Sequence, residues 1–211
     1  MTLLLIVIFG LSMVYVSSTS RIEAYISVLA IQGFILFGMV LLDFGKMPAA
    51  GFIFLCVETL ALKAVMIPAF LMYTVRKNSI FREVEPYIPN FYSVVITSFI
   101  FAAGLAAAFW ASKAGPGIKP MYFGISLAAV ITGLFIIISR KKVITHVMGY
   151  VMLENGIFML ALSMASEMPM VVSMGVLLDL FAAVFMLGLF ISRINSTFDE
   201  LHIDSLSSLK D

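Results

Sequence analysis

Two carboxylates stand out in the sequence because each lies near the middle of a long hydrophobic segment. Glu154 interrupts VITHVMGYVMLENGIFMLALSMA, and Asp179 interrupts the next segment, MVVSMGVLLDLFAAVFMLGLFIS. An ionisable group at bilayer depth is costly and commonly marks an ion or proton pathway. The chemistry that these residues favour is therefore the movement or sensing of protons.

The two carboxylates are expected to lie at nearly the same depth. The short connection SEMP makes their helices antiparallel, and each carboxylate lies roughly 12 to 13 residues from the centre of that turn. Two carboxylates at one depth on adjacent helices can share or pass a proton. Asn155 could orient Glu154 or a water, and His146, about two turns earlier on roughly the same face, could relay protons inward. The alternatives are that the carboxylates only hydrogen-bond neighbouring helices and that His146 is an interfacial residue.

An earlier segment, FIFLCVETLALKAVMIPAFLMYT, carries Lys63 near its midpoint and Glu58 five residues before it. In an α-helix that spacing is about 140° of rotation, so the two side chains are expected to face different neighbours. Pro68 frees the carbonyl of Ala64, and a kink there would let water approach Lys63. Lys63 is a candidate proton relay or charge sensor; alternatively, it is a fixed countercharge for a carboxylate of another subunit. Gln32, in the middle of the second segment, either organises water or joins helices.

The composition describes an integral membrane protein with almost no soluble domain. The 211 residues are 62% hydrophobic and 12% charged, with a mean hydropathy of +1.11, whereas soluble domains carry about 25% charged residues. The net charge of +1 gives no reason to expect a nucleic-acid partner. The lone Cys56, the two histidines and the missing phosphate-binding motif predict no cofactor, metal or active site in this chain.

The apolar runs are continuous rather than alternating, which predicts an all-α, polytopic bundle of about seven transmembrane helices in a single unit, 1–193, with a cytoplasmic tail, 194–211. Nine Lys and Arg fall on one side of the expected topology and three on the other, so the N-terminus should face outside and the C-terminus the cytoplasm. The first segment lacks the marks of a cleaved signal peptide. The expected helices are 2–18, 24–42, 52–75, 91–112, 121–139, 143–165 and 170–193.

Several stretches resemble component E of hydrogenase-4, namely VMGYVMLENGIFML, VLLDLFAAVFMLGLFISRI, DELHIDSLSSLKD and the earlier LKAVMIPAFLMYTVRK. The resemblance covers nearly the whole chain. It implies a non-catalytic membrane-arm subunit of an energy-converting hydrogenase or formate hydrogenlyase, akin to respiratory complex I, in the inner membrane of a prokaryote. It also implies that the nickel–iron centre and iron–sulfur clusters lie in partner subunits. The expected partners are antiporter-like and quinone-site-like membrane subunits, the peripheral hydrogenase subunits and the lipid bilayer.

The last three expected helices, 121–193, also resemble subunit K of complex I, a three-helix protein with acidic residues in its second and third helices. By this resemblance Glu154 and Asp179 occupy the two carboxylate positions, although Asp179 stands where that pattern has Glu and the connection between the helices is shorter here. The implied function is proton translocation coupled to electron transfer in other subunits. Two alternatives stay open: a structural linker without proton traffic, and a stand-alone cation/proton transporter, against which the lack of a convincing internal repeat counts.

Overall fold

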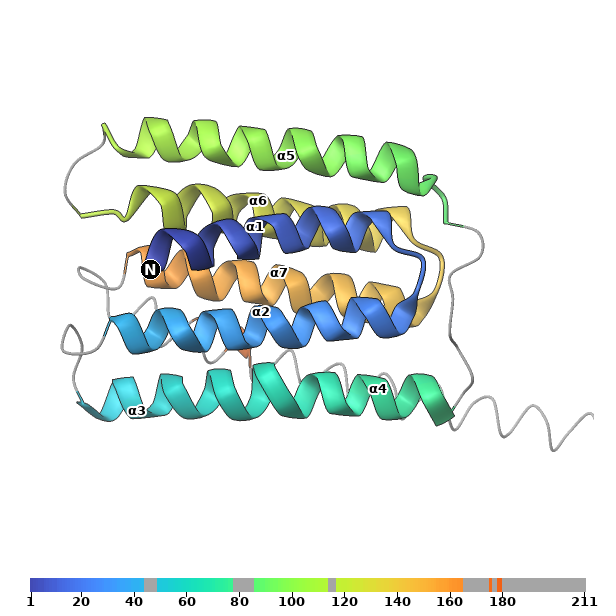
Figure 1. Cartoon of the computed structure of the whole chain (residues 1–211), viewed down its shortest axis with the longest axis horizontal. Coiled ribbons are helices and arrows are strands. Elements are labelled where there is room, and N and C mark those ends of the chain that lie inside the picture. The colour runs from blue at the N-terminus through green and yellow to red at the C-terminus, as the bar shows by residue number, and fades with distance from the viewer. Residues whose placement is uncertain (44–48, 78–85, 114–116, 165–174, 176–177, 180–211) are drawn as a thin grey trace, which may run out of the picture. The chain divides into compact units, whose positions relative to one another are not determined.

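The computed structural model describes residues 1–43, 49–77, 86–113 and 117–164, together with Gly175, Leu178 and Asp179. The chain divides into two compact units, Met1–Gly175 and Val176–Asp211. Every element of the described residues is a helix, and the helices of the first unit run side by side in a bundle (Figure 1). The predicted all-helical fold is therefore confirmed for this part of the chain.

The first six of the expected segments are helical over nearly the expected residues. Five described helical segments are long and apolar enough to cross a membrane, and α1 is a shorter apolar helix. The third segment is one continuous helix whose central part is π-helical (Figure 1). The bounds are α1 (Thr2–Ser18), α2 (Ile22–Leu42), α3 (Ala49–Val57), the π-helix η1 (Glu58–Met66), α4 (Ile67–Lys77), α5 (Asn90–Ala111), α6 (Pro120–Ser139) and α7 (Val143–Ser163).

The expected seventh helix, 170–193, lies outside the described residues except for Gly175, Leu178 and Asp179, which are helical. The tail, 194–211, lies wholly outside them. The count of seven helices and the orientation of the termini therefore stay predictions.

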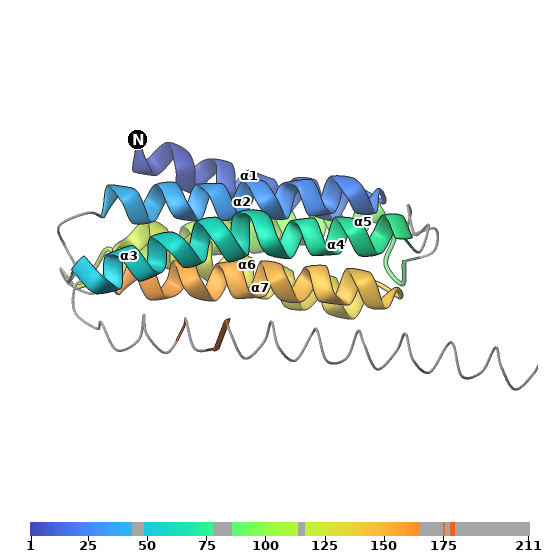
Figure 2. The same ribbon diagram turned by 90° about the horizontal axis from the view of Figure 1, so that it is seen from below.

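Glycines allow α5, α6 and α7 to pack closely. A Cβ atom added to Gly104 in α5 would lie 2.6 Å from the carbonyl oxygen of Gly124 in α6. A Cβ added to Gly156 in α7 would lie 2.9 Å from the Cβ of Ala129 in α6. Small residues of this kind let membrane helices approach backbone to backbone. One side of α7 is thereby held against α6, and α7 also contacts α2. In the view from below, the continuous helix of α3 and α4 runs between α2 and α7 (Figure 2).

Polar contacts fasten both ends of the bundle. At one end Arg140, which is 1% exposed, donates from Nη1 to Asn90 Oδ1 at 3.0 Å and from Nη2 to the carbonyl oxygen of Ser17 at 3.1 Å. These contacts join the ends of α1, α5 and α6. At the other end Lys119 Nζ lies 2.6 Å from Asp43 Oδ2, which joins the start of α6 to the end of α2. The basic residue counted in the sequence as a loop charge, Arg140, is thus a buried part of the fold.

Candidate functional site

A buried ion pair connects η1 to α7 near the middle of both segments. Lys63 Nζ lies 3.9 Å from Glu154 Oε1, and the two side chains are only 2% and 3% exposed. The distance is too long for a direct hydrogen bond between these two atoms. It is nevertheless short enough for strong attraction between opposite charges away from water. The sequence did not predict this pairing, because the two residues lie on segments far apart in the chain.

The α7 helix presents two groups to the same ammonium. Phe158 follows Glu154 by four residues, which is about one helical turn and places both on one face. Lys63 Nζ lies 5.1 Å from the centroid of the Phe158 ring, within the range of a cation–π interaction. The Lys63 ammonium is thus held between the Glu154 carboxylate and the Phe158 ring. These two groups do not supply all three of the hydrogen-bond acceptors that an ammonium can bind.

The backbone that carries Lys63 is π-helical rather than α-helical. The η1 helix covers Glu58–Met66, and the N–H of Ile67 donates to the carbonyl of Leu62, five residues earlier. In this geometry residues five apart lie nearly one above the other. The 140° of rotation expected between Glu58 and Lys63 in an α-helix therefore does not apply here, and whether they face different neighbours stays a prediction.

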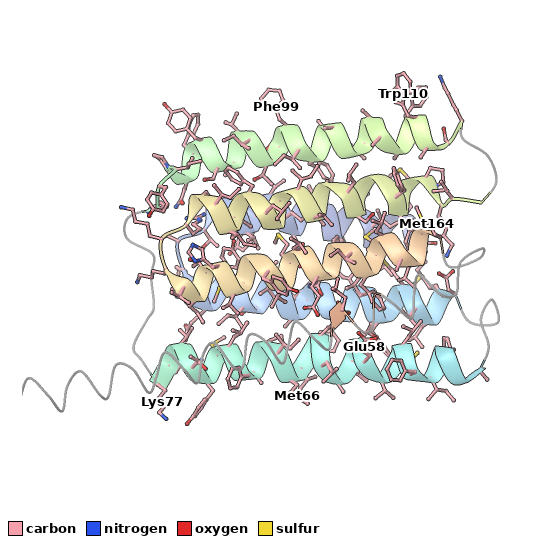
Figure 3. All side chains as sticks on the ribbon, turned by 180° about the vertical axis from the view of Figure 1, so that it is seen from behind. Glu58, Met66, Lys77, Phe99, Trp110 and Met164 are labelled. Atoms are coloured by element: carbon pink, nitrogen blue, oxygen red, sulfur yellow. The ribbon has the colours of Figure 1, made fainter. Side chains whose placement is uncertain are left out.

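Glu58 and Lys63 are both buried, at 5% and 2% exposure. Figure 3 shows Glu58 on the side of its helix that faces the rest of the bundle, whereas Met66 points away from it. The distortion expected near Pro68 takes the form of this π-helix, which ends just before the proline. Widening the turn ahead of a proline relieves the clash between its ring and the preceding carbonyls.

A chain of buried amides continues from α7 toward α1. Asn155 Nδ2 donates to Gln32 Oε1 at 3.3 Å, and Gln32 Nε2 donates to Ser12 Oγ at 2.8 Å. Asn155 and Gln32 were expected to act as supporting polar groups, and the structure brings them together. Ser12 was missed. The signal that could have found it is a small hydroxyl residue in the middle of an otherwise apolar segment, a common helix-to-helix contact in membranes.

The α2 backbone touches η1 at the position of the ion pair. A Cβ atom added to Gly33 would lie 2.7 Å from the Cα of Ala64 and 2.7 Å from the carbonyl carbon of Lys63. Gly33 directly follows Gln32, so the same turn of α2 contacts both the Lys63 backbone and the Asn155 amide. The α2, η1 and α7 helices thus meet at one polar site.

His146, one of the predicted pathway residues, lies away from this site. His146 is half-buried near the start of α7, and its Nε2 is 2.7 Å from the carbonyl oxygen of Arg140. It therefore lies at the basic end of the bundle, and its role as a proton relay stays a prediction. Asp179 is helical together with Leu178 in the second unit. Its pairing with Glu154 stays a prediction as well. The described residues contain no group of three or more His, Cys, Asp or Glu that could hold a metal ion.

Parts of the chain are similar to known complex I-like subunits. Residues 121–211 match the family described as NADH-ubiquinone/plastoquinone oxidoreductase chain 4L. The chain is 29% identical to hydrogenase-4 component E of Escherichia coli over 94 residues, which are 44% of this chain and 43% of that protein. Over these regions the chain is similar to complex I-like membrane subunits. The resemblance to component E is thereby confirmed, although the aligned region is less than half of either protein.

A longer similarity extends over both halves of the chain. An uncharacterized protein of Mycobacterium tuberculosis is 27% identical over 191 residues, which cover 90% of this chain and 87% of that protein. No solved structure matches the chain. The chain 4L match begins at α6, so it includes Glu154 and Asp179 but not Lys63. The cation of the buried pair therefore comes from outside the region shared with chain 4L.

Proposed function

We propose that this chain is a membrane-arm subunit that contributes to proton translocation in a complex I-like oxidoreductase, while electron transfer takes place in other subunits. The observation that carries the proposal is the Lys63–Glu154 pair, buried at the meeting point of α2, η1 and α7. Glu58 from the same π-helix adds a second buried carboxylate. The similarity to chain 4L and to hydrogenase-4 component E supports the assignment to a membrane arm.

A buried Lys–Glu pair is a poor device for stability alone. Removing two charges from water is so costly that the mutual attraction often only balances it, and a well-packed apolar pair serves the fold as well or better. Lys63 and Glu154 are both titratable, so each can exist in a charged and a neutral form. A pair retained at this depth in place of apolar residues is therefore better suited to proton binding and release.

The pair couples two protonation events. At about 4 Å, opposite charges attract by about 4 kcal/mol at an effective dielectric constant of about 20. When a proton arrives on Glu154, that attraction disappears, and the charged form of Lys63 loses a countercharge. Release of a proton from Lys63 then becomes easier. Protonation on α7 is thereby transmitted to η1 without a large movement of either helix.

The proposed setting follows from the family. The nickel–iron centre and iron–sulfur clusters would lie in peripheral hydrogenase subunits, and this chain would contact antiporter-like and quinone-site-like subunits in the inner membrane of a prokaryote. We propose the N-terminus outside and the C-terminus in the cytoplasm. Asp179 would be a further carboxylate of the pathway, and His146 would extend it toward the basic end of the bundle.

The test is the Glu154→Gln variant in the intact complex, purified through a tag on this chain or kept in inverted membrane vesicles. Glutamine keeps the size of the side chain but cannot carry the proton. We expect proton uptake to be lost while electron transfer to an artificial dye acceptor continues. The matched control is Glu23→Gln, since Glu23 is a carboxylate exposed to solvent that pairs with Arg76 at 3.1 Å; it should leave both activities unchanged.

Two results would contradict the proposal in different ways. Proton uptake that persists in Glu154→Gln would remove this carboxylate from the pathway. Disassembly of the complex on native gels, with no separate effect on proton uptake, would instead favour a structural linker. Mass spectrometry of the tagged complex tests the setting independently, because recovery of this chain alone would contradict a subunit role.

A further inference from the structure

The direction of every hydrogen bond in the amide chain is set by one backbone carbonyl. The Ser12 hydroxyl donates to the carbonyl oxygen of Phe9 at 2.6 Å, and that oxygen can only accept. The single proton of the hydroxyl is thereby used, so Ser12 can only accept from Gln32 Nε2. The Gln32 oxygen must then face α7, where it accepts from Asn155 Nδ2. The amide of Asn155 is consequently held in one of its two orientations by a residue two helices away.

This orientation leaves a buried acceptor beside the ion pair. Asn155 is 1% exposed, and its Oδ1 atom has no hydrogen-bond partner among the described residues. A buried oxygen without a donor is energetically costly. Glu154, the preceding residue, gains an O–H donor when it is protonated. Consecutive side chains on a helix point about 100° apart, so the donor that this arrangement calls for is a water bound to the protonated carboxyl group, which can bridge Glu154 to the fixed Asn155 oxygen.

We propose that Ser12 is a positioning residue for the proton on Glu154: by fixing Gln32, it holds the Asn155 oxygen as an acceptor that favours the protonated carboxyl group. A hydrogen bond to the neutral form of a carboxyl group stabilises that form. If the amide could turn over, its NH₂ group would favour the carboxylate instead. This inference rests on the proposed function, since it concerns the same carboxyl group.

The amide chain is an orienting device and is not itself a proton wire. A side-chain amide passes a proton only through an unfavourable tautomer, and the hydroxyl proton of Ser12 is already donated to its own helix. Protons therefore cannot enter or leave the amide chain through Ser12. The chain can set the state of Glu154, whereas proton transfer to and from Glu154 takes place on the side of Lys63.

The experiment measures the infrared C=O band of protonated Glu154, identified as the band missing from Glu154→Gln, in the full chain reconstituted in lipid nanodiscs at fixed pH. Lys63 and Glu58 are present in every other variant, so their charges are common to all spectra. We expect Ser12→Ala to shift and weaken the band, Ser12→Cys to do so partly, and Ser12→Thr, which keeps the hydroxyl, to restore it. Exchange into H₂¹⁸O shows whether the donor is the carboxyl group or a bound water.

The matched control is Ser17→Ala. Ser17 lies on the same helix, is buried and forms a side-chain hydrogen bond of 2.7 Å with Thr97 of α5. Its removal disturbs α1 packing without touching the amide chain, so the Glu154 band should not move. In an Asn155→Ala background, Ser12→Ala should have no further effect, because the two residues act through one chain.

An unchanged Glu154 band in Ser12→Ala, in protein that elutes as wild type, would overturn the inference. So would an equal shift in Ser17→Ala, which would indicate a general packing effect. The proposed function fails separately: if Glu154→Gln retains proton uptake in the complex while Ser12→Ala still shifts the band, Ser12 positions the proton but that proton is not translocated.

Discussion

Two cations are buried among the described residues of the bundle, and they differ in both geometry and chemistry. Arg140 lies at one end and donates hydrogen bonds of 3.0 and 3.1 Å to neutral oxygens of Asn90 and Ser17. Lys63 lies in the middle and faces Glu154 at 3.9 Å and an aromatic ring. A guanidinium stays charged in proteins, whereas an ammonium loses its proton readily when buried.

The difference separates a structural role, that of Arg140, from a role in proton transfer, that of Lys63. These two contacts of Arg140 are short, directional and made to groups that do not titrate, so they have one state and join helix ends. The Lys63–Glu154 contact is longer, and both partners can change charge, so this cluster has several states. Substitutions at the end of the bundle should therefore affect folding, and substitutions in the middle should affect proton transfer.

The largest expected effect on stability is that of Arg140→Ala. It removes a large, fully buried side chain and leaves the Asn90 and Ser17 oxygens without these donors, a combination that typically costs about 3–5 kcal/mol. We expect little folded protein after detergent extraction and a lowered unfolding temperature for what remains, both measured by circular dichroism. Arg140→Lys should recover only part of the loss, because an ammonium cannot reproduce the planar fork. Wild-type unfolding of Arg140→Ala would show that the two buried cations do not differ in this way.

The next effect is that of Lys63→Met, which should abolish proton uptake but destabilise the fold less than Arg140→Ala. The carboxyl group left behind can take up a proton and become neutral, which limits the penalty for losing its partner. The double variant Lys63→Met/Glu154→Gln should be more stable than Lys63→Met alone, because it removes the remaining buried charge. It should nevertheless stay inactive. A double variant less stable than Lys63→Met would indicate that the pair is a structural element like Arg140.

A smaller effect is expected where α2 touches the backbone of Lys63 and Ala64. Gly33→Ala would bring a methyl group to 2.7 Å from backbone atoms of Lys63 and Ala64, and overpacking of this kind costs about 1–3 kcal/mol. Proton uptake should fall more than stability, because the displaced segment carries Lys63. Gly51→Ala is the matched control, since no atom lies within 4 Å of its added Cβ. Equal behaviour of the two variants would argue against a sensitive α2–η1 contact.

The sequence predicted the parts of this comparison that depend on local pattern. Continuous apolar runs gave the helices, because a spanning helix must satisfy its own backbone and tolerates few charges. The same rarity of charge identified Lys63 and Glu154 individually, and Gln32 and Asn155 as their polar neighbours. The length of an apolar run and the cost of a buried charge are both properties of one segment, so no tertiary information was needed.

What the sequence did not predict depends on how segments pack. The Lys63–Glu154 pairing requires α7 to be held against α6 through Gly156 so that its other side meets η1. The π-helix was missed because helical periodicity was assumed to be that of an α-helix, and its hydrogen-bond register has no sequence pattern that we recognised. Ser12 was missed because a serine in a helix usually bonds its own backbone, which Ser12 also does.

The smallest expected effect sharpens the contrast between buried and exposed pairs. Glu23 accepts a hydrogen bond of 3.1 Å from Arg76 Nε, shorter than the contact of the central pair, but the Arg76 side chain is 66% exposed and that of Glu23 34%. Exposed pairs contribute about 0–1 kcal/mol, because water and salt screen the attraction. Arg76→Gln should therefore leave the unfolding temperature and proton uptake nearly unchanged, in unfolding scans and vesicle assays at low and high salt. If it reduced proton uptake as strongly as Lys63→Met does, burial would not be what distinguishes the central pair, and the short distance at the surface would have to be given equal weight.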